Sequence, residues 1–310
     1  MALTGQQYAI SAGEHRATVV EVGAGLRHYA FGGSDVTFAY GEDELPPRCC
    51  GAVLVPWPNR LRAGKYSFDG VDYQLPLTEP LAGNAIHGLG RWARWTCVRR
   101  EPSSVTLGLD IVAQTGWPFE VRVEVTYALD AEHGLSVSTL ARNQGARRAP
   151  FGAGFHPYLA VEDHPLSKVT LQLPASERLV TDDAQIPIGN QAVQHTSHDF
   201  RRGRRLGAVR LDDAFTGLQT SEGRGAAEVR LRHSSVRLWF DETFQYLQVF
   251  TPDVLARDQP AIAIEPMTCP ADAFNTGTGL IVLEPGKVWT GAWGLQPVSG
   301  RGDSPGRADP

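Results

Sequence analysis

Residues 119–129 read FEVRVEVTYAL, and this stretch decides the fold class. Phenylalanine, valine, tyrosine and leucine occupy every second position, and glutamate, arginine and threonine stand between most of them. A period of two is typical of a β-strand that packs one face on the core and turns the other to solvent. Residues 105–112, VTLGLDIV, show the same alternation. Both stretches therefore predict strands with one buried face.

Further short apolar runs follow throughout the chain. Residues 66–75, YSFDGVDYQL, indicate two strands around Asp69-Gly70, a dipeptide suited to a tight hairpin turn because both residues tolerate positive φ. Convincing helical patterns are missing, and 33 glycines and 21 prolines punctuate the chain as turns between strands require. We predict an all-β fold, a sandwich or barrel of many antiparallel strands. Other expected strands are LSVSTL (135–140), VRLWF (236–240), YLQVF (246–250), AIAI (261–264) and LIVL (280–283).

The length of 310 residues allows one large domain or two ordinary ones. Because the interior shows no linker and no internal repeat, we expect residues 1–297 to form a single domain. Residues 298–310, VSGRGDSPGRADP, are rich in glycine, proline, serine and charge, which predicts a disordered C-terminal tail. The integrin-type tripeptide at 301–303 is interpreted as a chance match, since no secretion signal is visible.

The bulk composition argues against several classes of function. A formal net charge of −5 does not favour binding to nucleic acid or to an acidic membrane surface. The chain shows no signal-peptide pattern and no apolar run near the ~20 residues of a membrane-spanning helix, so we expect a cytoplasmic protein. The four cysteines form no C-x-x-C pair. His195 and His198 lie in a polar stretch without a third ligand, so we expect no metal site.

Three of five candidate side chains stand in turn-like surroundings. Arg60 follows the proline-rich turn PWPN, and its guanidinium suits hydroxyl or carboxylate recognition, although a surface arginine capping a turn would look the same. His87 lies in GNAIHGLGRW, where glycines let the backbone approach a ligand closely; a buried histidine bonded to a carbonyl is the alternative. Asp212 and Asp213 lie in LDDAFTGL, and one of them would accept hydrogen bonds from substrate hydroxyls, unless they form an acidic turn.

The other two candidates end apolar runs. His156 stands in FGAGFHPYL before Pro157, which has no backbone donor, so the strand ladder should stop there and free the imidazole to face a cleft. A satisfied core histidine is the alternative. Glu265 ends the run AIAIE before Pro266, and burial at a strand end would raise its pKa and suit a general base. Together the five residues form an acid/base set that moves protons without a nucleophile or a metal.

Five segments in order resemble the aldose 1-epimerase (galactose mutarotase) family. They are PWPNRLRAGKYSFDGVDYQLP, NAIHGLGRWARW, FGAGFHPYL, LDDAFTGL and IAIEPMTCPADAFNTGTGLIVLEPG. The resemblance runs from about residue 25 to residue 296, and the PWPNR and HPY motifs are similar to a bacterial branch of the family. It implies a large antiparallel β-supersandwich with few short helices and an open cleft on one sheet. It also implies an isomerase that interconverts α and β anomers of a free aldohexose without a cofactor.

The resemblance further implies a role for each residue. Glu265 would be the general base that takes the proton from the C1 hydroxyl, and His156 the general acid that protonates the ring oxygen. The C1–O5 bond then opens, the aldehyde rotates about C1–C2, and the ring closes on the other face. His87 would hold the ring oxygen or a neighbouring hydroxyl. Arg60 and Asp212 would grip ring hydroxyls.

The sugar itself is left open by the sequence. A neutral aldohexose, a hexose 6-phosphate and a sulfonated sugar all fit, and a non-catalytic sugar-binding protein is a further alternative that the pair of His156 and Glu265 disfavours. We expect a small-molecule sugar as the only partner of a monomer or homodimer. Spare arginines would serve an anionic sugar or lie on the surface: Arg62, Arg91, Arg201 and Arg202. Three tryptophans would stack on a sugar or belong to the core: Trp57, Trp92 and Trp117.

Overall fold

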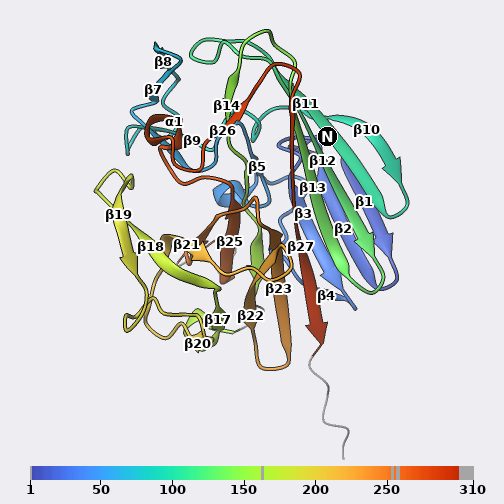
Figure 1. Ribbon diagram of the computed structural model, residues 1–310. Coiled ribbons are helices and arrows are strands. Elements are labelled where there is room, and N and C mark those ends of the chain that lie inside the picture. The colour runs from blue at the N-terminus through green and yellow to red at the C-terminus, as the bar shows by residue number, and fades with distance from the viewer. Residues whose placement is uncertain (1, 162–163, 253–254, 256–258, 300–310) are drawn as a thin grey trace, which may run out of the picture.

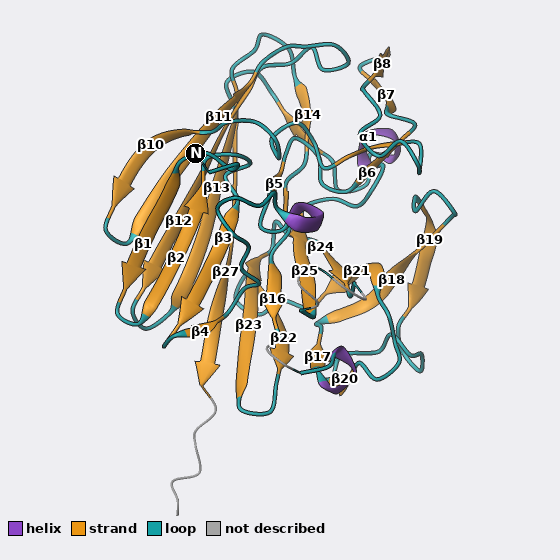
Figure 2. Cartoon of the chain, turned by 180° about the vertical axis from the view of Figure 1, so that it is seen from behind, coloured by secondary structure: helices purple, strands orange, loops and turns teal. Residues whose placement is uncertain are grey.

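The computed structural model describes residues 2–161, 164–252, 255 and 259–299. Strands dominate it (Figures 1 and 2), and the pairings that build its two large sheets are antiparallel. The predicted all-β fold with few short helices is confirmed. No helix in the described part of the chain is long and apolar enough to cross a membrane. The helical segments there are α1 (Ala273–Thr276) and the 3₁₀ turns Pro47–Cys49 and Leu166–Lys168.

The larger sheet has nine strands and contains most of the stretch 119–129, since the strand begins at Val121. In β12 (Val121–Asp130) burial alternates residue by residue up to Leu129, as the sequence predicts. Leu107 of the neighbouring strand is the partner of Val125, so apolar side chains of adjacent strands share one face. The sheet order is β10 (Thr96–Glu101), β11 (Ser104–Ile111), β12, β13 (Gly134–Asn143), β27 (Val288–Ser299), β23 (Ser234–Asp241), β22 (Arg224–Arg230), β17 (Thr170–Gln172) and β20 (Arg204–Arg205).

The second large sheet has eight strands and carries both acid/base candidates. Its strand β25 (Ala261–Met267) is buried at every residue and has paired strands along both edges. The sheet order is β19 (Pro187–Ala192), β18 (Ala175–Thr181), β21 (Asp212–Leu218), β24 (Tyr246–Phe250), β25, β15 (Gly154–Phe155) and β5 (Val53–Leu54), and β16 (Tyr158–Ala160) also pairs with β25.

Smaller sheets complete the molecule. The predicted hairpin around Asp69-Gly70 is confirmed, with Phe68 and Val71 paired and positive φ at both turn residues. The hairpin lies close to α1 at one end of the molecule (Figure 1). The four-stranded sheet is β1 (Gln7–Ala12), β2 (His15–Val20), β3 (Leu26–Phe31) and β4 (Ser34–Asp35). The two-stranded sheets are β6 (Arg60–Arg62) with β9 (Asn84–Ile86), β7 (Lys65–Phe68) with β8 (Val71–Gln74), and β14 (Ala149–Phe151) with β26 (Ile281–Leu283).

The hydrophobic core joins the two large sheets. Its main cluster extends along the chain from Tyr8 to Leu295. Phe155 from the eight-stranded sheet and Trp293 from the nine-stranded sheet are both almost fully buried, and their ring centroids lie 5.2 Å apart. The sequence pattern therefore produces two sheets that pack their apolar faces together.

The last strand reaches beyond the expected end of the domain. β27 continues to Ser299, two residues into the segment 298–310 that the composition predicts as a tail. The rest of that segment, including the tripeptide at 301–303, lies outside the described residues.

Candidate active site

The two acid/base candidates come from neighbouring strands of the eight-stranded sheet. β15 ends immediately before His156, and β16 begins immediately after Pro157. The ladder is therefore interrupted where the proline predicts it. On the opposite edge, the His156 backbone N–H donates to the carbonyl oxygen of Ala52 at 3.1 Å, which continues the register of β15 with Val53 and Leu54. The side chain of Glu265 comes from the strand on the other side of this interruption.

The expectation that the strand ends at Glu265 is wrong by two residues. β25 continues through Pro266 to Met267. The Ile264 N–H points toward the interrupted side of the sheet, where it meets the carbonyl oxygen of Pro157 at 3.4 Å. Because backbone donors alternate between sides, the donor that Pro266 lacks would point to the same side. Pro266 lies opposite Phe155, the last residue of β15, so its missing donor contributes to the break that begins at His156.

His156 and Glu265 meet in the interior. His156 Nε2 lies 3.4 Å from Glu265 Oε1, and the side chains are only 7% and 3% exposed. Burial raises the pKa of Glu265 well above its usual range, and the charge of Asp212 adds to the rise while Arg60 opposes it. Burial also lowers the pKa of His156 to about 3, and Arg91 acts in the same direction. Both groups are therefore pushed toward their neutral forms, with one proton between them.

His87 is fixed beside this pair by a two-way contact with Asn59. The His87 N–H donates to the Asn59 carbonyl oxygen at 2.9 Å, and the Asn59 N–H donates to His87 Nδ1 at 3.2 Å. Since Nδ1 accepts, the neutral ring carries its proton on Nε2. Burial lowers the pKa of His87 well below its ordinary value, and His156, at 5.5 Å between ring centroids, lowers it further. His87 is thus a neutral hydrogen-bond donor.

The glycine after His87 has a different purpose from the expected one. Gly88 has φ 68°, and a Cβ there would collide with the carbonyl oxygen of Val55. The glycine therefore permits close approach of two chain segments rather than of a ligand. This approach holds the turn that carries His87 against the segment preceding Arg60.

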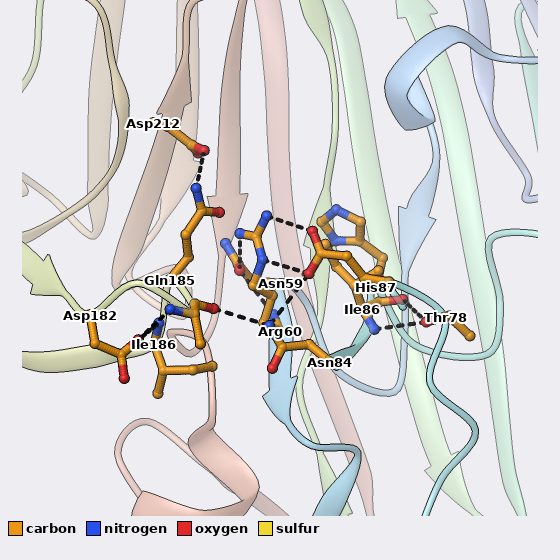
Figure 3. A network of polar contacts seen from close by, with 12 residues as sticks. Asn59, Arg60, Thr78, Asn84, Ile86, His87, Asp182, Gln185, Ile186 and Asp212 are labelled. Carbon is orange, nitrogen blue, oxygen red and sulfur yellow. Dashed lines mark hydrogen bonds and ion pairs between the residues drawn. The ribbon is translucent and has the colours of Figure 1, made fainter. Parts of the chain in front are cut away.

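Arg60 and Glu79 form a two-pronged ion pair at the pocket wall (Figure 3). Arg60 Nε donates to Glu79 Oε2 at 2.8 Å, and Nη2 donates to Oε1 at 2.9 Å. Arg60 Nη1 makes only a longer contact of 3.4 Å with the Asn59 side-chain oxygen. The arginine is therefore not a free surface cap, and one of its three nitrogens remains weakly engaged.

The two adjacent aspartates take separate roles. Asp212 accepts a hydrogen bond from Gln185 Nε2 at 3.1 Å (Figure 3) and another from Gln248 Nε2 at 2.8 Å. Asp213 instead accepts from Arg178 Nη1 at 2.6 Å. Because successive side chains of a strand point to opposite faces, only one of the two reaches the pocket. That residue is Asp212.

All five candidate residues line one pocket of about 530 Å³. This volume lies within the range of about 300–1,000 Å³ that is typical of small-molecule sites. The sequence therefore predicts a set of residues that the fold brings together. The lining residues are Arg48, Cys49, Asn59, Arg60, Thr78, Glu79, Ile86, His87, Arg91, His156, Tyr158, Gln185, Asp212, Gln248, Phe250 and Glu265.

The four additional arginines and the three tryptophans lie in different surroundings, and only some of them are near the pocket. Of the four arginines, Arg91 lines the pocket, whereas Arg62 pairs with Asp182 and Arg201 pairs with Asp199. Trp57 and Trp117 are buried in the core, and Trp92 is 51% exposed. Arg202 is exposed and outside the pocket lining.

Several pocket residues were missed by sequence reasoning. Gln248 faces Glu265 across the ladder and is 5% exposed, so a polar side chain inside the apolar run YLQVF was the available signal. Glu79, Arg48 and Cys49 lie in connecting segments, where single charged or polar residues carry no periodic signal. Only the folded chain places them beside the acid/base pair.

Solved structures share this architecture. A putative aldose 1-epimerase from Escherichia coli K12 superposes with a TM-score of 0.82 at 21% identity, over 95% of this chain and 99% of that one. A GalM/aldose epimerase homologue from Caenorhabditis elegans superposes with a TM-score of 0.84 at 18% identity, with the same coverage. The fold is therefore galactose mutarotase-like.

Sequence comparisons agree with the structural ones. The profile of the family described as aldose 1-epimerase matches residues 6–296. The uncharacterized protein YihR of E. coli K12 is 35% identical over 291 residues, 93% of this chain and 92% of that protein. Human galactose mutarotase is 28% identical over 215 residues, 65% of this chain and 59% of the human protein. Fold and matches together define a carbohydrate isomerase of the mutarotase class. The chain belongs to the aldose 1-epimerase family.

Proposed function

We propose that the protein interconverts the α and β anomers of a free aldohexose by acid/base-catalysed ring opening and closure. The observation that carries the proposal is the buried 3.4 Å contact between His156 Nε2 and Glu265 Oε1 in a pocket of sugar-binding size. Opening a hemiacetal requires one group that takes a proton and one that gives a proton, each worth roughly 10²–10⁴-fold in rate.

The reaction starts from the arrangement of the one-proton pair in which Glu265 is ionised and His156 carries the proton, an arrangement that burial disfavours. Glu265 takes the proton of the C1 hydroxyl while the C1–O5 bond breaks, and His156 gives a proton to the ring oxygen. The open-chain aldehyde then lies beside a neutral Glu265 and a neutral His156, which are the forms that burial favours. After rotation about C1–C2, closure returns the proton of Glu265 to O1 and that of O5 to His156.

The other residues hold the sugar in place. His87 presents its Nε2–H to the ring oxygen or to a neighbouring hydroxyl, since Asn59 occupies its Nδ1. Arg60 offers Nη1 to a hydroxyl, and Asp212 accepts from one. A role in binding alone is disfavoured, because a buried carboxylate beside a buried imidazole destabilises the fold and brings a binding protein no benefit.

An anionic sugar, either a hexose 6-phosphate or a sulfonated sugar, is the second candidate substrate. Besides Arg60, two arginines line the pocket, and the described residues provide neither of them with a carboxylate partner. The Arg48 guanidinium lies over the Phe250 ring at 5.8 Å. The Arg91 guanidinium lies over the Trp92 ring at 5.9 Å, and its Nη1 is 3.0 Å from Cys49 Sγ. Unneutralised guanidinium groups bind phosphate and sulfonate oxygens well.

Polarimetry on freshly dissolved sugars tests both candidates. We expect faster decay of optical rotation than in buffer for α-D-glucose or α-D-galactose. Acceleration confined to a hexose 6-phosphate or a 6-sulfonated hexose, weakened about tenfold by Arg91→Gln, would select the second candidate. The matched control is Arg62→Gln, because Arg62 pairs with Asp182 outside the pocket lining. No acceleration on any of these sugars would overturn the proposal.

A further inference from the structure

The Arg60–Glu79 pair is more buried and has a more fixed geometry than a typical surface ion pair. Two parallel hydrogen bonds of 2.8 and 2.9 Å join the guanidinium and the carboxylate, and the side chains are 15% and 24% exposed. A fork of this kind fixes the plane of the guanidinium as well as its position. Because both groups line the pocket, the fork determines how Arg60 meets a ligand.

Glu79 is itself anchored to the strand that leads to His87. Its backbone exchanges hydrogen bonds with Asn84, N–H to O at 3.0 Å and O to N–H at 3.2 Å. The preceding Thr78 binds Ile86 through its hydroxyl, which accepts the Ile86 N–H at 2.9 Å. β9 in turn pairs with β6, with Ile86 opposite Arg60. The carboxylate therefore belongs to the same rigid unit as His87 and Arg60.

The charge of Arg60 acts on the acid/base pair. The groups that influence Glu265 are its neighbour His156, the carboxylate of Asp212, which raises its pKa, and the guanidinium of Arg60, which lowers it. Burial raises the pKa of Tyr158 and of Cys49, and the charge of Glu265 adds to the rise for both. A carboxylate held 2.8 Å from Arg60 opposes the positive charge of the guanidinium. Without it, Arg60 would stabilise the ionised form of Glu265 more strongly.

We propose that Glu79 is a positioning residue, which fixes the Arg60 guanidinium so that Nη1 meets a sugar hydroxyl and which offsets the Arg60 charge beside Glu265 and His156. Glu79 acts through Arg60 and contributes no proton to the reaction. The inference rests on the proposed mutarotase activity.

The experiment is a double-mutant cycle read by polarimetry on wild type, Glu79→Gln, Arg60→Ala and the double variant. We expect Glu79→Gln to raise KM about tenfold with kcat within a few-fold of wild type. The decline of kcat/KM at alkaline pH should begin at a lower pH, because the Arg60 charge, no longer opposed by the Glu79 carboxylate, lowers the pKa of Glu265. In the Arg60→Ala background, Glu79→Gln should leave KM unchanged, because the positioning effect requires the Arg60 guanidinium.

The matched control is Asp199→Asn. Asp199 forms an equivalent fork with Arg201, at 2.9 and 2.8 Å, outside the pocket lining. This variant should keep wild-type kinetics, and thermal unfolding of all variants should confirm that each one is folded. Additive effects of Glu79→Gln and Arg60→Ala, or an unmoved alkaline limb in Glu79→Gln, would overturn the positioning role alone. An inactive wild type would overturn the mutarotase proposal and this inference with it.

Discussion

His156 and Glu265 face each other across an interruption in their own sheet, with Nε2 and Oε1 3.4 Å apart. β15 and β16 leave a gap at His156, and β25 carries Glu265 past that gap. A regular ladder would have used the backbone groups here for strand pairing. The register is the same on both sides of the break, with Gly154 opposite Met267 and Tyr158 opposite Ala263, and it places His156 opposite Glu265.

The pH dependence of activity should be asymmetric. Burial lowers the pKa of His156 to about 3 and raises the pKa of Glu265 well above its usual range. A second proton therefore binds to the pair only in strong acid, and the last proton leaves only above the raised pKa of Glu265. After subtraction of the buffer rate, kcat/KM should show no acid limb near pH 6.5 and should fall on the alkaline side. An acid limb near pH 6.5 would mean that His156 titrates as an ordinary exposed histidine.

Replacing Glu265 should stabilise the fold in a pH-dependent way. The folded-state pKa of Glu265 lies above its unfolded value, so its favourable contribution is complete below the unfolded pKa and disappears as pH rises through the folded pKa. Glu265→Gln removes a carboxylate that is unfavourable to ionise when buried. At pH 8 its Tm should exceed that of wild type by about 2–4 °C, and the difference should shrink toward pH 4.

The control for this stability experiment is Glu120→Gln. Glu120 is exposed, so the same chemical change should leave Tm unchanged at both pH values. A Glu265→Gln variant with the same Tm difference at pH 4 and pH 8 would contradict a raised pKa in the folded state.

Neutralising Asp212 should weaken substrate binding more than turnover. Asp212→Asn removes the charge and replaces one acceptor oxygen at the pocket wall with an amide donor, and we expect KM to rise about tenfold with kcat within a few-fold of wild type. The alkaline limb should also move to lower pH, because the charge of Asp212 contributes to the raised pKa of Glu265. Asp213→Asn is the neighbouring control, since Asp213 pairs with Arg178. Equal effects of the two variants would argue against a specific role for Asp212.

Much of the fold could be predicted from the period of the sequence. The alternation in 119–129 predicts a strand with one solvent-exposed face, and the structure shows that burial pattern in β12. The end of β25 could not be placed, because Pro266 usually closes a strand and here occupies a position opposite a broken ladder. The pairing of distant strands decided where β25 ends, and a rule based on neighbouring residues in the sequence does not include such pairing.

The candidate site was predictable where a polar residue interrupts an apolar run. His156 and Glu265 give that signal, and both line the pocket. Glu79 and Arg48 do not, since charged residues in connecting segments are common on any surface. Their place beside the acid/base pair depends on long-range pairing, such as that of β6 with β9.

The most direct test of the account is the rate of anomer interconversion by Glu265→Gln at saturating sugar, measured by polarimetry beside wild type. The amide preserves the shape of the side chain but takes up no proton from the C1 hydroxyl. We expect kcat of Glu265→Gln to fall by about 10²–10⁴-fold while its Tm at neutral pH does not decrease. A folded Glu265→Gln variant with kcat near that of wild type would contradict the role of the His156–Glu265 pair.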